Sequence, residues 1–117
     1  MRERILKIVP LLPEVPAIPE AARQLFIAAA GQIKQATTPA GLDLPIALLR
    51  KSLEQAPWWG NAYYNLSRAL ELRGQYEDAI RQLNYYLELK PAEADANEAK
   101  AHLIVLETER DAATHKQ

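Results

Sequence analysis

A shift of 34 residues superimposes one amphipathic segment of this chain on another. Under this shift the following residues coincide in identity or in apolar or aromatic character: Leu42 with Tyr76, Ile46 with Ile80, Leu49 with Leu83, Leu53 with Leu87, Glu54 with Glu88 and Pro57 with Pro91. Repeats of this length are helix–turn–helix units that stack into a solenoid, because one unit alone cannot bury its apolar face. The repeat therefore predicts an all-helical chain built from stacked hairpins.

Apolar residues recur with helical spacing through the chain after residue 19. This pattern predicts helices over about 19–36, 43–57, 58–73, 76–90 and 94–111, and no segment alternates with the period of a β-strand. We expect Asp43 to cap the second of these helices and Gly74 to end the third. Gly31, inside the first, is expected to allow a close approach of a neighbouring helix.

The stretch from Asn61 to Pro91 resembles the tetratricopeptide repeat (TPR). The resemblance rests on large or apolar side chains at the family's spacing, a glycine in the hairpin turn and a closing proline: Tyr63, Leu66, Gly74, Tyr76, Ala79, Leu83 and Pro91. Ser67 departs from the pattern by replacing the usual glycine or alanine where the helices cross. Tyr86 replaces a small residue, so we expect looser packing there or an aromatic contact with the last helix.

The resemblance implies an all-α fold of right-handed superhelical hairpins, with two repeats and a C-terminal capping helix. Repeat 1 spans about 19–57 and is a diverged copy, because its hairpin loop is lengthened at 37–41. Repeat 2 spans about 58–91, and the capping helix about 94–112. Residues 19–117 then form one TPR-like domain.

The first 18 residues are expected to form an extended arm. Prolines recur at every third position, which is the period of the polyproline II helix: Pro10, Pro13, Pro16 and Pro19. Proline also pushes the preceding residue toward extended geometry, which disfavours a helix at Leu12, Val15 and Ile18. The arm could serve as a linker or dock into an aromatic-lined groove.

Composition excludes several classes of function. Fourteen basic and fifteen acidic side chains leave the chain nearly neutral, whereas nucleic-acid binding usually needs a basic excess. The chain has no cysteine, so disulfides and zinc–thiolate sites are excluded. The apolar runs are too short to span a bilayer. A cytoplasmic location is favoured, and a periplasmic one is the alternative if an export signal has been removed.

The residue pattern does not indicate catalysis. Each of the two histidines follows an acid by four positions, His102 after Glu98 and His115 after Asp111. Two separate pairs do not supply the three or four converging ligands of a metal site, so we interpret them as surface ion pairs. The glycines are scattered, and neither serine has a histidine close in sequence. We therefore expect no enzyme activity, no cofactor and no metal.

The third predicted helix has two different sides. At 100° per residue, Tyr63, Leu66 and Leu70 point toward the core, and a mixed set of side chains points the opposite way. In TPR proteins that opposite side lines the concave groove that holds peptides or partner helices. By this resemblance the candidate groove residues, with one tryptophan at the helix entrance, are Trp58, Asn61, Tyr64, Asn65, Arg68 and Leu72. The alternative is an ordinary solvated face.

The sequence thus predicts a protein-interaction module, a scaffold or adaptor that binds a peptide or helix of a partner. One alternative is a self-associating unit, a homodimer or larger, whose groove is filled by its own or a neighbour's arm. An enzyme accessory or metal carrier is the least favoured alternative. Chaperone-binding TPR proteins clamp a C-terminal carboxylate, but here Phe26 and Ala30 stand where that clamp requires a lysine and an asparagine, and only Asn65 matches. We expect no such clamp.

Overall fold

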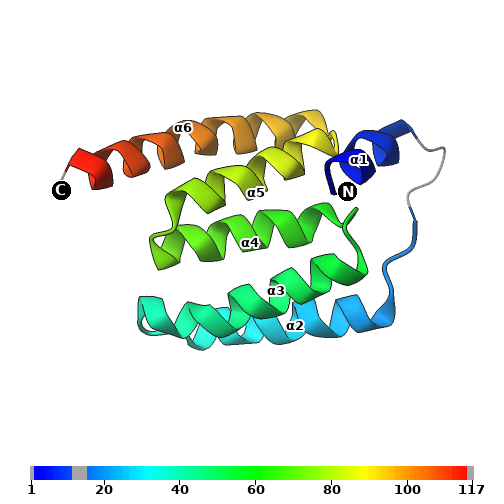
Figure 1. The fold of residues 1–117 in the computed structure, drawn as a ribbon, viewed down its shortest axis with the longest axis horizontal. Helices are drawn as coiled ribbons and strands as arrows, with labels where there is room; N and C mark the ends of the chain where they lie inside the picture. Colours follow the sequence, from blue (N-terminus) through cyan, green and yellow to red (C-terminus); the bar gives the residue numbers. More distant parts are fainter. Residues whose placement is uncertain (1, 12–15, 116–117) are drawn as a thin grey trace.

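The computed structural model describes residues 2–11 and 16–115 of the chain (Figure 1). Its regular elements are six α-helices and two short 3-10 helices: α1 (Arg2–Ile8), η1 (Val9–Leu11), α2 (Glu20–Gln35), η2 (Pro39–Leu42), α3 (Asp43–Gln55), α4 (Gly60–Arg73), α5 (Tyr76–Glu88) and α6 (Glu93–His115). No β-strand occurs in the described part of the chain. The prediction of an all-helical fold is confirmed, and the predicted helix boundaries agree with the observed ones to within a few residues.

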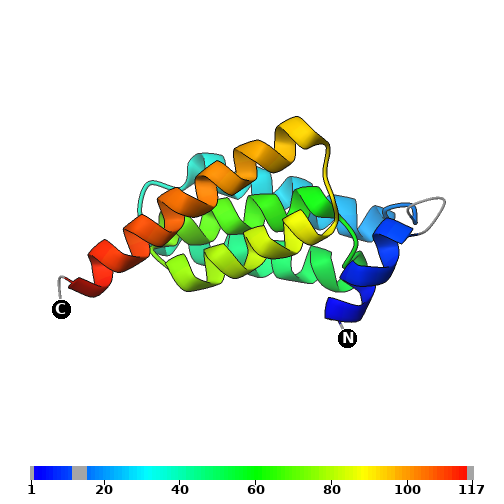
Figure 2. The same cartoon turned by 90° about the horizontal axis from the view of Figure 1, so that it is seen from above.

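The helices pack in the order in which they follow one another in the chain. Helices α2 and α3 form one antiparallel hairpin and α4 and α5 a second, while α3 packs on α4 and α6 on α5 (Figure 1). Figure 2 shows α6 running obliquely across the second hairpin, with its C-terminal end beyond the turn between α4 and α5. Every helix from α2 to α6 therefore contacts its neighbours in sequence.

Helix α4 lies at the centre of the hydrophobic core. Tyr63, Leu66 and Leu70 have no exposed surface and are surrounded by buried residues of α3, α5 and α6. The hydroxyl of Tyr63 donates a hydrogen bond to the carbonyl of Pro57, and burial raises the pKa of Tyr63 to about 12. The predicted core side of this helix is confirmed.

Two buried serines hold the hairpins together. The hydroxyl of Ser52 on α3 donates to the carbonyl of Ala22 on α2, and that of Ser67 on α4 donates to the carbonyl of Ala79 on α5. Both carbonyls belong to helices whose backbone already forms its own ladder, and each accepts a second bond. Ser67 is therefore accommodated at the helix crossing because it is small and its hydroxyl has a partner.

Asp43 does not cap α3, contrary to the sequence-based expectation. The 3-10 turn η2 runs directly into the helix, so Asp43 is already its first helical residue and its carboxylate accepts a hydrogen bond from Arg73. A side-chain cap is found at η2 instead, where the amide of Gly41 donates to Thr38 Oγ1. At the end of α4, Gly74 adopts the left-handed conformation with φ of 89° and stops the helix as predicted.

The prediction of an extended N-terminal arm is wrong for residues 2–11. Arg2–Ile8 form α1, because no proline occurs before Pro10 and the segment can bury an apolar side against α5. Leu6 has no exposed surface and belongs to the main core. Residues 16–19 have no regular secondary structure, as expected, whereas residues 12–15 lie outside the described ranges.

Polar contacts also tie α1 to the second hairpin. The hydroxyl of Tyr85 on α5 donates a hydrogen bond to the carboxylate of Glu3, and the guanidinium of Arg2 lies 5.7 Å from the centre of the Tyr63 ring. The rings of Tyr63 and Tyr85 are themselves in edge contact, 5.7 Å apart. Helix α1 therefore closes one end of the core.

Replacement of Leu83 by alanine should lower the free energy of unfolding by about 2–5 kcal/mol, because Leu83 is 1% exposed and the substitution leaves a cavity. Chemical denaturation followed by circular dichroism measures the difference. The matched control is Glu88→Ala on the exposed side of the same helix, which should change stability little. A Leu83→Ala variant as stable as the control would contradict the observed packing of α5.

Two of the four glycines, Gly31 and Gly74, should respond to alanine in opposite directions. Gly31 does not mediate the expected helix contact, since it is exposed and a Cβ there would meet nothing within 4 Å. Gly31→Ala should raise the free energy of unfolding by about 0.5–1 kcal/mol, because alanine loses less backbone entropy in a helix. Gly74→Ala should lower it by about 1–2 kcal/mol, because φ is positive there. Thermal melts of both variants measure the signs.

Candidate binding surface

The candidate groove residues form a continuous strip along α4. Asn61, Arg68 and Leu72 are exposed, and Tyr64 and Asn65 are half-buried, while Trp58 is half-buried just before the helix begins. Their spacing places them on the side of α4 that faces away from Tyr63, Leu66 and Leu70. We call these six residues the α4 strip: Trp58, Asn61, Tyr64, Asn65, Arg68 and Leu72.

The α4 strip passes three separate hollows. Trp58 and Asn61 line one of about 350 Å³, where α4 begins. Asn65 lines a second of about 160 Å³ beside α2, and Leu72 lines a third of about 220 Å³ beside η2. Tyr64 and Arg68 lie between these hollows. The structure therefore brings the six residues together as a strip and not as one pocket.

The hollow beside Asn65 is mostly apolar. Its walls are supplied by Phe26, Ala30 and Ile33 of α2 and by Leu49 of α3, and Lys34 lies at its border. Phe26 and Ala30 thus do lie opposite Asn65, where a carboxylate clamp would need polar groups. The arrangement fits an apolar side chain better than a carboxylate, because a buried charge requires paired donors.

Aromatic rings gather where α4 begins. The rings of Trp59 and Phe26 are 4.5 Å apart, and those of Tyr64 and Tyr86 are 5.5 Å apart. Sequence reasoning did not select Trp59 and Tyr86 as site residues, although it singled out Tyr86 as unusual. The main aromatic contact of Tyr86 is with α4, and the residue also lines the hollow that Asp95 of α6 borders.

A cluster of charged side chains joins α4 to α6 beside the strip. His102 Nε2 lies 2.7 Å from Glu71 Oε1, and the guanidinium of Arg68 lies 3.9 Å from the same carboxylate. The predicted pairing of His102 with Glu98 is not what the structure shows, because the tertiary packing places Glu71 within hydrogen-bond distance. Asp111 likewise contacts Arg110 and not His115.

Glu109 completes this cluster on α6. Burial raises the pKa of the Glu109 carboxyl, as do its hydrogen bond to Glu71 and the like charge of Glu71, while His102 and Arg68 oppose the shift. Two carboxylates in contact favour a shared proton over two negative charges. The contact between α4 and α6 therefore brings together two carboxyl groups, and the charge of Glu71 opposes ionisation of Glu109.

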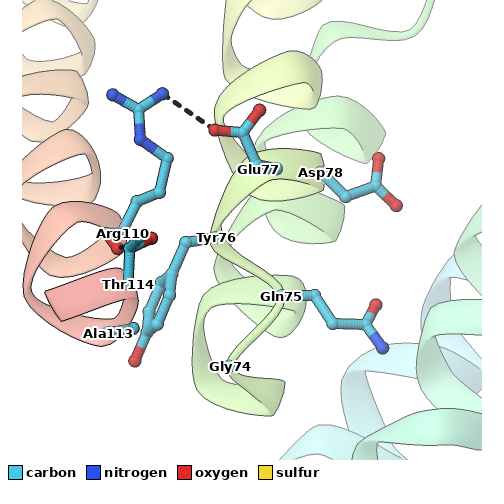
Figure 3. A pocket seen from close by; sticks show the side chains of 8 residues that line it. All are labelled: Gly74, Gln75, Tyr76, Glu77, Asp78, Arg110, Ala113 and Thr114. Atoms are coloured by element: carbon cyan, nitrogen blue, oxygen red, sulfur yellow. Dashed lines mark hydrogen bonds and ion pairs between the residues drawn. The ribbon is translucent and has the colours of Figure 1, made fainter. Parts of the chain in front are cut away.

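A different hollow, of about 400 Å³, lies between the turn after α4 and the C-terminal part of α6 (Figure 3). Arg110 on α6 and Glu77 on α5 face each other across it and form an ion pair of 2.8 Å. Asp78 points away from the hollow and pairs with Arg50 of α3. Each of the three charged side chains that line this hollow thus already has an ion-pair partner.

Two further properties of the described residues bear on function. They contain no group of three or more histidine, aspartate or glutamate side chains that could hold a metal ion. No helix among them is long and apolar enough to cross a membrane.

Glu109→Gln should raise the melting temperature at pH 7, because it removes one of two like charges. The pKa of Glu109 is raised in the folded protein, so folding favours its protonated form, and the cost of its charge disappears as the pH falls through the raised value toward 4.5. The gain of the variant over the wild type should therefore be present at neutral pH and absent below 4.5. The control Glu107→Gln, at an exposed position on α6, should show no such dependence. An equal gain at both pH values would contradict the coupling to Glu71.

Comparison of the chain with models of known protein families finds no match, and comparison with curated protein sequences finds none either.

Proposed function

We propose that this protein is an interaction module of the TPR type that binds a peptide or a helix of a partner protein along the α4 strip. The observation that carries the proposal is the composition of the strip. It combines an exposed leucine, two amide side chains and an arginine on one side of a helix whose other side is fully buried. Tyrosine, tryptophan and arginine are the residues that contribute most to binding at protein interfaces.

The helices on either side of the strip add to this surface. Ile27 on α2 is 68% exposed and precedes Lys34, which lines the hollow of Asn65, by seven residues, so the two share one face of α2. Val105 on α6 is 45% exposed and follows His102, which contacts α4, by three residues. A partner lying on α4 would cover apolar side chains of α2 and α6 as well. In a superhelical arrangement of the two hairpins this side is the concave one.

Binding is favoured over catalysis because both serines and His102 have structural partners. Both serine hydroxyls are buried and donate to backbone carbonyls. His102 is held by Glu71, and neither serine lies in contact with it. A surface that binds a segment of a partner protein without catalysing a reaction on it suits a scaffold or adaptor role.

Self-association is the second candidate, and one observation bears on it. Helix α1 packs on α5 of its own chain, with Leu6 fully buried there. This packing disfavours a self-associated form in which the entire N-terminal arm crosses to a second copy of the chain. A homodimer formed through the exposed apolar residues of α2 and α6 is compatible with the same structure.

Selection of peptides from a random displayed library, followed by binding measurements on single peptides, tests the proposal. Peptides that bind the wild type should lose at least about tenfold in affinity for Leu72→Asp, which places a charge in the strip. They should bind Asn84→Asp unchanged, because Asn84 is exposed on α5, outside the strip. Circular dichroism establishes that both variants are folded. A library that yields no binder, or binders indifferent to Leu72→Asp, refutes the proposal.

A further inference from the structure

The aromatic hollow at the start of α4 has the features of a built site. It measures about 350 Å³ and is lined by the rings of Trp58, Trp59 and Tyr86, with Asn61 and Asp95 as its polar side chains. The end of α5 and the beginning of α6 meet at the same end of the molecule as the start of α4 (Figure 1). Three helices, the segment before α4 and, through Val9 and Ile18, the N-terminal segment therefore converge on one aromatic cavity.

Two of the rings are held in place by packing on other aromatic rings. Trp59 packs on Phe26 of α2 and Tyr86 on Tyr64 of α4, with ring centres 4.5 and 5.5 Å apart. Rings fixed in this way lose little freedom when a ligand stacks on them, so binding costs less entropy. The cavity is preformed for flat apolar groups.

The third ring carries a polar group that lacks a partner. Trp58 Nε1 is buried, and no acceptor among the described residues accepts its hydrogen bond. A buried N–H without a partner is unfavourable, so a rotation of the Trp58 side chain that brings its N–H within hydrogen-bond distance of an acceptor would be favourable. A ligand with exposed carbonyl oxygens supplies such an acceptor.

Two acidic side chains of α6 lie at or near the cavity: Asp95 lines it, and Glu98 lies close to the Tyr86 ring that lines it. Asp95 lies in the first turn of α6, Glu98 follows it on the same helix, and no basic side chain of the described residues forms an ion pair with either. Both carboxylates are near Tyr86: burial raises the pKa of its hydroxyl first, and the charge of Asp95 and then of Glu98 adds to the effect. A cationic group at this border would therefore be attracted.

We infer that the cavity formed by Trp58, Trp59 and Tyr86 binds a proline-containing segment of a partner protein in the polyproline II conformation, with a lysine or arginine beside the prolines. The aromatic rings stack on the proline rings, and the basic side chain reaches Asp95 and Glu98. The amide of Asn61 and the indole of Trp58 donate hydrogen bonds to the backbone carbonyls of the segment.

The all-helical architecture favours this conformation over the alternatives. An extended peptide usually binds by adding a strand to a sheet, and the described chain offers no strand for it to pair with. A polyproline II segment needs no such ladder and leaves its carbonyls free for single hydrogen bonds. A helical ligand about 10–12 Å wide is too large for a cavity of this volume, and an acidic peptide would be repelled by its border.

The inference deepens the proposed function, because Trp58 and Asn61 belong to the α4 strip. The proposed function and the inference about the cavity can nevertheless fail separately. Displayed peptides that depend on Leu72 and are indifferent to Trp58 would leave the interaction module in place and overturn the aromatic cavity as its site.

Intrinsic fluorescence gives a direct assay, because the only two tryptophans of the chain both line the cavity. The probe is a short synthetic peptide with proline at every third position, leucine between the prolines and an arginine at one end. Titration into the full chain should give a saturable change in tryptophan emission. A peptide with alanine for each proline should not bind, and one with glutamate for arginine should bind at least about threefold more weakly.

Variants identify the residues responsible. Trp58→Ala should weaken binding of the probe at least about tenfold, as measured by calorimetry, and Asp95→Asn about threefold to tenfold. The matched control for Asp95→Asn is Glu107→Gln, farther along α6, which should bind as the wild type does. Trp58→Phe keeps a ring and removes the indole N–H, so its melting temperature should be no lower than that of the wild type, and its affinity for the probe should be reduced.

Three results would overturn the inference. The first is no emission change up to millimolar peptide with a folded wild type. The second is equal binding of the arginine and glutamate peptides. The third is a Trp58→Phe variant that is folded, as shown by circular dichroism, and binds the probe as tightly as the wild type.

Discussion

The burial of one side of α4 between the neighbouring helices is the constraint on which the rest of the structure depends. Tyr63, Leu66 and Leu70 have no exposed surface, and burial of such side chains is the main favourable term in folding. Because a helix advances 100° per residue, burying these three positions determines which residues face the opposite way. The core of the protein and its candidate binding surface are therefore two sides of one helix, and neither can be rotated without the other.

The two ends of the molecule differ in how their acidic side chains are paired. At the turn between α4 and α5, Arg110 pairs with Glu77 and Arg50 with Asp78, so the charges there hold α3, α5 and α6 together. At the other end, Asp95 lines the aromatic hollow and Glu98 follows it on α6, and neither forms an ion pair with a described residue. The ion pairs at the turn join neighbouring helices, whereas Asp95 and Glu98 join no other helix through an ion pair of the described residues.

The candidate site was predictable only as far as it lies on one helix. Periodicity identifies the side of α4 that carries Asn61, Arg68 and Leu72, because the spacing of a helix is a local property. The pairing of His102 with Glu71 joins residues 31 positions apart, so the spacing of four residues between Glu98 and His102 was misleading. Trp59 and Tyr86 were missed for the same reason, since Trp59 packs on Phe26 of α2 and Tyr86 packs on Tyr64 of α4.

The sequence by itself determined that this chain is helical, where its main helices begin and end, and which side of each is apolar. These properties follow from hydrogen bonds and side-chain spacing within a single turn or two, so they are written in consecutive residues. Only the tertiary structure decided that Arg2–Ile8 form a helix, because seven residues are too few to hold a helix alone and Leu6 becomes buried only when α1 packs on the rest of the core. It also decided which hollows open beside α4, since a cavity is bounded by side chains of several helices and its shape depends on how those helices pack.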